Sequence, residues 1–181
     1  AAVAGGVTSL ACPPDTRPPL DEPGLVERLV RRAADAGLAR VLPVGALTVG
    51  LKGEALAELG SLARAGCIAF SQGSNAPIVD TQVLLRAMQY AATFGYPLHL
   101  QAQDKHLARD GVAHDGEVAS RLGLPGIPAA AESAAIATAL ELVRTTGARL
   151  HFTRISSAAG IALLQRARDE GLPVTCDIGV H

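Results

Sequence analysis

The chain has 181 residues, of which 49% are hydrophobic and 18% are charged, and its formal net charge at pH 7 is -1. This balance is typical of a globular chain with one sizeable core and excludes a disordered one. Because the charge is so small, general attraction to nucleic acid or to an anionic membrane surface is excluded, and we expect neither partner.

Short β-branched runs alternate along the chain with longer segments of helical periodicity, which predicts βαβ units in a parallel sheet. Continuously apolar runs such as Val41-Leu42-Pro43-Val44 are typical of strands buried on both faces. A doubly wound sheet and a barrel both satisfy this pattern. The six predicted strands cover residues 6–12, 39–45, 66–70, 97–101, 148–152 and 173–177.

Three intervening segments carry apolar stripes at helical spacing, and a glycine able to end a helix follows four of the helical segments. The stripes are Leu25, Val26, Leu29, Val30 and Ala33, then Leu84, Leu85, Met88 and Ala91, then Ile161, Leu163, Leu164 and Ala167, and the glycines are Gly37, Gly95, Gly147 and Gly171. Residues 105–128 are rich in Gly and Pro and are predicted to form a long non-helical connection. Connections of that length are usually functional or interaction elements.

The three cysteines, Cys12, Cys67 and Cys176, have no CxxC spacing and cannot all pair. We expect them to stay reduced, as small apolar residues in or beside strands. The first twelve residues lack the basic segment of a signal peptide, and no apolar run reaches the ~18 residues of a membrane span. These features predict a cytoplasmic protein.

Functional residues of a parallel barrel lie at the carboxyl ends of its strands. The side chains of interest there are Asp15, Gln72, Gln101, Gln103, His151, Arg154, Asp177 and His181.

Around these positions the sequence resembles the dihydroorotases of the amidohydrolase superfamily. The resemblance covers essentially the whole chain and is carried by residues 4–8, Pro14, Thr16, Pro18, Asp21, and residues 41–48, 51–54, 65–71, 121–128 and 131–132. It implies a metal-dependent (β/α)8 TIM-type barrel that interconverts carbamoyl aspartate and dihydroorotate in pyrimidine biosynthesis. Residues 1–181 would be an incomplete central portion of that barrel, one partial domain with about six parallel strands. The family's first metal motif would precede Ala1, and its catalytic Asp would follow His181.

The departures from the family's pattern fall on the metal site. Gln101 and Gln103 stand in the family's His-Ala-Glu-Asp motif, Arg154 replaces the second His of a His-x-x-His pair that begins at His151, and Gln72 lies where a bridging carboxylate is expected. A neutral amide is a poor zinc ligand, and a guanidinium has no lone pair to donate. The positive charge would also repel a dication by about 8 kcal/mol at ~4 Å with an effective dielectric near 20. We therefore expect zinc to be absent.

Two further expectations concern charge at this site. Asp15 stands where the family has a substrate-binding Asn, and it would repel a substrate carboxylate. The guanidinium of Arg154 is expected to form an ion pair with Asp15, Asp104 or Asp177 across the vacated pocket.

The five histidines are assigned from their positions. His99 alternates in step with Gln101 and is predicted to point into the barrel as a core residue. His106 and His114 are expected to be solvated within the long connection. His151 and His181 match family histidines, His151 the non-ligating member of its pair.

The resemblance implies a non-catalytic dihydroorotase homologue, a pseudoenzyme. In the family such chains associate with aspartate carbamoyltransferase, so a hetero-oligomer with the catalytic chain of that enzyme is implied. The alternative is an active metal-dependent amidohydrolase with an atypical site around His99, His151, Asp177 and His181. A third reading, a sensor that binds a pyrimidine intermediate without converting it, is opposed by Asp15.

Overall fold

The computed structural model describes residues 1–73, 78 and 80–179. Within these residues, six parallel strands form one sheet in the order β1-β2-β3-β4-β7-β8, and β5 pairs separately with β6. All six predicted strands are confirmed. The strands are β1 (Ser9–Cys12), β2 (Arg40–Ala46), β3 (Ala69–Ser71), β4 (Leu98–Gln101), β5 (Ala113–His114), β6 (Gly126–Ile127), β7 (Leu150–Ile155) and β8 (Val174–Ile178).

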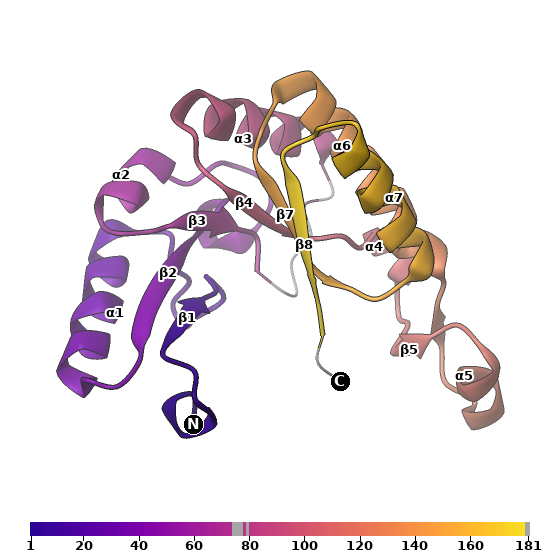
Figure 1. The fold of residues 1–181 in the computed structure, drawn as a ribbon, viewed down its shortest axis with the longest axis horizontal. Coiled ribbons are helices and arrows are strands. Elements are labelled where there is room, and N and C mark those ends of the chain that lie inside the picture. The colour runs from indigo at the N-terminus through magenta and orange to yellow at the C-terminus, as the bar shows by residue number, and fades with distance from the viewer. Residues whose placement is uncertain (74–77, 79, 180–181) are drawn as a thin grey trace.

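Helices cover the outer side of this curled sheet. Figure 1 shows α1, α2, α3, α6 and α7 following one another around its convex side, the arrangement of a parallel α/β barrel that is open on one side. The helices are α1 (Pro23–Ala36), α2 (Leu59–Arg64), α3 (Thr81–Phe94), α4 (Lys105–Ala108), α5 (Glu117–Leu122), α6 (Ala129–Thr146) and α7 (Ala158–Asp169), with short 3-10 turns at Val3–Gly5 and Val49–Leu51.

The alternation of side chains along the strands divides the core from the site. Leu98 and Leu100 of β4, and Leu150 and Phe152 of β7, are buried in the layer between the sheet and the helices. The residues between them face the other way, toward the inside of the curl. His99 is in register with His151 there, as Gln101 is with Thr153.

Residues 105–128 are hereafter called the excursion. The prediction that they form a long non-helical connection is wrong. The excursion contains α4, α5 and the β5–β6 pair. Local capping explains the first helix, because the Asp104 carboxylate accepts hydrogen bonds from the backbone amides of His106 and Leu107 at 2.9 and 2.8 Å. Figure 1 shows the excursion projecting from the body of the fold, with α5 at its far end.

Other corrections are smaller. β1 begins at Ser9 rather than residue 6, because the preceding 3-10 turn ends at Gly6 with φ +81°. Two residues of the predicted apolar stripes, Val30 and Ile161, are exposed, at 40% and 41%. The glycines that follow the helices all have positive φ, as expected of helix ends: Gly37, Gly95, Gly147 and Gly171.

The three cysteines differ in how deeply they are buried. All three cysteines are free, but only Cys67 is buried, while Cys176 is exposed on β8. Burial raises the pKa of the Cys67 thiol to about 12. None of the helices in the described part of the chain has the length and apolar character needed to cross a membrane.

Candidate functional site

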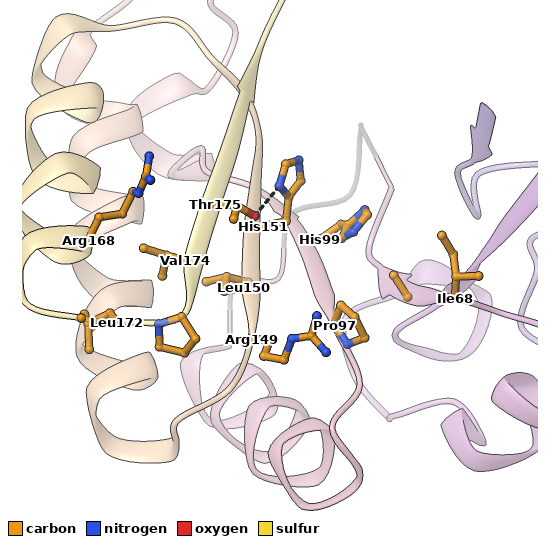
Figure 2. Close-up of a pocket in the computed structure, with 13 residues that line it drawn as sticks. Ile68, Pro97, His99, Arg149, Leu150, His151, Arg168, Leu172, Val174 and Thr175 are labelled. Atoms are coloured by element: carbon orange, nitrogen blue, oxygen red, sulfur yellow. Dashed lines mark hydrogen bonds between the residues drawn. The ribbon is translucent and has the colours of Figure 1, made fainter. Parts of the chain in front are cut away.

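His151 lies at the centre of a hydrogen-bonded group on the inner face of β7 and β8. Its Nε2 is 2.9 Å from Asp177 Oδ2, and its Nδ1 is 2.8 Å from Thr175 Oγ1. Figure 2 shows the imidazole of His151 turned toward Thr175, with His99 on the next strand; the two ring centroids are 4.9 Å apart. Both nitrogens of His151 are therefore engaged by protein groups.

This group shifts the pKa of two of its members. Burial lowers the pKa of His99, the neighbouring His151 lowers it further, and Asp177 opposes the change. Burial by itself would raise the pKa of Asp177, but hydrogen bonds from His151 and from the backbone amide of Arg154 bring it below its ordinary value. Asp177 is accordingly a carboxylate at neutral pH, and His99 a neutral imidazole.

Arg154 occupies the carboxyl end of β7 with an unusual backbone. Its φ is +58°, and the pairing of β7 with β8 shifts register between Phe152 and Ile155. The backbone amide of Arg154 donates to Asp177 Oδ1 at 2.7 Å, which ties this kink to β8. A non-glycine residue with positive φ is strained by about 1 kcal/mol, so the surrounding contacts must hold it in place.

The guanidinium of Arg154 reaches across to the neighbouring strand end. Its Nη2 donates to Gln101 Oε1, and Gln101 Nε2 in turn donates to Gln103 Oε1 at 3.4 Å. The expected ion pair is wrong for Asp104 and Asp177, since neither carboxylate lies within 4 Å of the guanidinium and Asp104 is used to cap α4. The guanidinium of Arg154 therefore donates to an amide oxygen rather than to a carboxylate.

Gln72 follows β3 and is 3% exposed. The backbone amide of Gly53 donates to Thr48 Oγ1 at 2.9 Å, and the Thr48 hydroxyl donates to Gln72 Oε1 at 2.8 Å. This chain of donors leaves Gln72 Nε2 buried and, among the described residues, without a hydrogen-bond partner. Gln72 is thus held by Thr48, and among the described residues it forms no hydrogen bond with Gln101 or Arg154.

Asp15 and the remaining histidines complete the predicted set. Asp15 lies beside Gly73, where a Cβ on the glycine would be 3.2 Å from Asp15 Cβ. His99 lies on the inner face, as predicted, but it is only half-buried and is not part of the core. His106 and His114 are exposed, although they belong to α4 and β5 rather than to a loop. His181 lies outside the described residues.

Sequence reasoning missed Thr175 and Glu132. Thr175 is two residues before Asp177 on β8, so strand alternation alone could have placed both on one face. Each carboxylate oxygen of Glu132 accepts two hydrogen bonds, from the amide and hydroxyl of Ser156 and from those of Ser157, at 2.6–2.9 Å. This contact joins α6 to Ser157, the N-cap of α7, and to the residue before it.

Below His99 and His151, the inner face carries a cavity of about 540 Å³. Figure 2 shows Arg149 and Arg168 at this end of the curl, away from the carboxyl ends of the strands. The chemistry expected of the barrel does not extend to it, because Gln101 and Arg154 lie at the opposite end of their strands.

The side chains at the carboxyl edge do not fit a zinc ion. Gln72 and Gln101 offer neutral amides, Arg154 offers a cation, and both nitrogens of His151 are occupied. In the part of the chain that the structure describes, no group of three His, Cys, Asp or Glu residues is placed to hold a metal ion.

Comparison with known proteins agrees with the geometry of the fold. The model of the family described as Dihydro-orotase-like matches residues 1–159. Over all 181 residues the chain is 50% identical to the dihydroorotase-like protein of Pseudomonas putida, 49% to that of Pseudomonas aeruginosa and 44% to the dihydroorotase of an Anaeromyxobacter species. It spans only 42%, 43% and 42% of the length of these relatives.

Solved structures support the same fold. The L-hydantoinase (dihydropyrimidinase) of Arthrobacter aurescens superposes with a TM-score of 0.76 at 23% identity, over 98% of this chain and 41% of that one. The D-hydantoinase of a Thermus species superposes with a TM-score of 0.68 at 19% identity, over 99% of this chain and 40% of that one. At these identities the likeness concerns the barrel architecture alone.

Proposed function

Because this chain belongs to the dihydroorotase-like family, we propose that it is part of a non-catalytic member, a pseudoenzyme of pyrimidine biosynthesis in the cytoplasm. Its role is to support the assembly or stability of aspartate carbamoyltransferase. One observation carries the proposal: the Arg154 guanidinium donates to Gln101 where the family resemblance places two metal ligands.

The chemistry of that contact argues against hydrolysis. The family's reaction needs a metal to lower the pKa of a water toward ~7. A guanidinium held against an amide cannot bind a metal, and its charge repels one. The backbone amide of Arg154 also donates to Asp177 Oδ1, which holds this residue at the end of β7.

The proposed partner rests on the resemblance. Both Pseudomonas relatives carry the name dihydroorotase-like protein, and they are more similar to this chain than the Anaeromyxobacter relative named dihydroorotase. A rigid barrel can present an interaction surface whether or not its pocket is active. Since the chain spans less than half of these relatives, partner and activity are proposed for the whole protein.

Metal analysis combined with a dihydroorotate hydrolysis assay tests the non-catalytic role. We expect less than stoichiometric zinc and no turnover for the protein with its own sequence. The triple variant Gln72→Asp, Gln101→His and Arg154→His should bind more zinc, because it restores donors at three strand ends, while His106→Gln on the surface should change nothing.

The opposite result favours the active amidohydrolase. Stoichiometric zinc in the unmodified protein, with turnover abolished by His151→Asn, would support an atypical site around His99, His151, Asp177 and His181. The engagement of both His151 nitrogens argues against that site.

The partner is tested separately by co-purification with the catalytic chain of aspartate carbamoyltransferase, followed by light scattering on a sizing column. We expect a complex larger than the transferase alone. If the transferase elutes unchanged at every ratio, the assembly role is wrong, whatever the metal analysis gives.

A further inference from the structure

We propose that a small monocarboxylate binds beside Arg154 at the carboxyl edge of the sheet, so that an anion occupies the place where the family resemblance expects a metal cation. The proposal goes beyond the assembly role and does not depend on it. It concerns the cavity around Arg154, hereafter called the edge cavity, and not the larger cavity at the amino ends of the strands.

The edge cavity has a volume of about 280 Å³. Sites for drug-sized ligands measure about 300–1,000 Å³, so this one suits a molecule of only a few carbon atoms. Its walls come from the ends of β4 and β7, the start of α6 and the β5–β6 pair of the excursion. The polar side chains that line it are Gln101, Gln103, His114, Glu132, Arg154, Ser156 and Ser157.

Arg154 brings a charge to this cavity that no carboxylate neutralises. Among the described residues that line the cavity it is the only Lys or Arg, and within that part of the chain its guanidinium forms no ion pair. A guanidinium has five N–H donors, and Gln101 Oε1 accepts from one of its nitrogens. The charge and most of the donors are therefore open to a ligand, and the planar fork matches the two oxygens of a carboxylate.

Gln103 provides a second donor in the same cavity. Its Oε1 accepts from Gln101 Nε2 at 3.4 Å, and Gln101 in turn accepts from Arg154. This order leaves the NH2 group of Gln103 as the end of the chain of hydrogen bonds, and no described residue accepts from it. Two neighbouring groups that only donate match a ligand that only accepts, which a carboxylate does.

The backbone of Arg154 also indicates a function for its side chain. Its φ of +58° falls where β7 and β8 shift register, and its amide is held by Asp177 Oδ1 at 2.7 Å. Strained residues of this kind gather at functional sites. A glycine would adopt the same conformation without strain but would provide no guanidinium. Use of the guanidinium therefore accounts for the strained backbone.

Two carboxylates near Arg154 limit the ligand to a single negative charge. Glu132 lines the edge cavity, and both its oxygens accept from Ser156 and Ser157. Asp177 accepts from the backbone amide of Arg154. Their oxygens are engaged by these donors, but their charges still repel a second negative charge on a ligand. A monocarboxylate is therefore preferred to a dicarboxylate or to sulfate.

Titration of the protein with sodium acetate and sodium butyrate, followed by the backbone amide signals in two-dimensional NMR at constant ionic strength, tests this site. We expect saturable shifts around the edge cavity with a dissociation constant of about 1–10 mM, because so small a ligand makes few contacts. Succinate and sulfate should bind about fivefold more weakly. No saturation up to about 100 mM, or tighter binding of the dianions, overturns the proposal.

Substitutions separate Arg154 from the other arginines of the inner face. Arg154→Gln keeps a side chain of similar length at the strained position and should weaken acetate binding about tenfold or more, because a charged donor is lost. Gln103→Leu should weaken it about threefold, since a neutral donor contributes less. Arg149→Gln changes an arginine of the larger cavity and is the matched control, which should leave binding unchanged. Circular dichroism checks that each variant folds.

Arg154→Lys provides a second test at the same position. It keeps the charge but loses the fork, so acetate should bind more tightly than to Arg154→Gln and more weakly than to the unmodified protein. Binding that survives Arg154→Gln, or that Arg149→Gln weakens equally, places the anion elsewhere and overturns the proposal.

Discussion

Glu132 joins two helices through one carboxylate, and replacing it with Gln should destabilise the fold. Glu132→Gln keeps the size of the side chain but turns one acceptor oxygen into an NH2 group that faces the amide and hydroxyl of a serine. Hydrogen bonds to a charged group contribute about 1.5–3 kcal/mol, and neutral ones about 0.5–1.5 kcal/mol. Because the side chain is partly exposed, water compensates some of this loss. We expect a decrease of about 2 kcal/mol in the free energy of unfolding.

The contribution of Glu132 to stability depends on pH. Burial by itself would raise the pKa of Glu132, but the hydrogen bonds from Ser157 and Ser156 bring it below the ordinary value of 4.5. The carboxylate therefore contributes stability above about pH 4.5, and this contribution is lost as the pH falls through the lower pKa of the folded state. The difference between the two proteins should shrink at acidic pH.

Urea unfolding followed by circular dichroism at pH 7 and at pH 3.5 measures both effects. Glu27→Gln, on the exposed side of α1, is the matched control and should change stability by less than about 0.5 kcal/mol. The reasoning about Glu132 is wrong if its variant is as stable as the control variant at pH 7. It is also wrong if the loss is the same at both pH values, because the charge would then play no part.

Three further outcomes follow from local geometry. Gly45→Ala should lower the free energy of unfolding by about 1–3 kcal/mol in urea melts, because the new Cβ would lie 2.9 Å from Phe70 Cδ1; unchanged stability would contradict this crowding. In thiol labelling at pH 8, Cys176 should react within minutes and Cys67 only on unfolding, because burial raises the pKa of the Cys67 thiol to about 12; equal rates would show that Cys67 is accessible. The ring of His99 should titrate below pH 6.5 when followed by NMR, since burial disfavours its charged form, and an unshifted midpoint would place it in water.

The sequence predicts the sheet well because its strands are short apolar runs that need no distant information. Leu98 and Leu100 alternate with His99 and Gln101 in the sequence, and the structure places the two pairs on opposite faces of β4. The helices of the excursion were not predicted, because neither carries a long apolar stripe. α4 is only four residues long and is capped by Asp104, and α5 is six residues long and buries only Ala119.

At the site, the identity of the substituted residues was predictable but their partners were not. That Arg154 replaces a ligand is visible in the chain itself, whereas its contact with Gln101 depends on a backbone with positive φ. The residue type does not predict that conformation, because a non-glycine residue seldom adopts it. Thr175 was not predicted, because a neutral hydroxyl within a strand gives no sign of the histidine that it contacts.

The buried contact between Thr48 and Gln72 constrains how this protein can change over generations. An apolar residue at position 72 would remove the unmatched amide nitrogen but strand the Thr48 hydroxyl, whereas a carboxylate there would satisfy the hydroxyl at the expense of a charge buried away from water. Each single step is therefore unfavourable, and only a paired exchange, such as Thr48→Val with Gln72→Met, escapes both. The history of the one position cannot be separated from that of the other.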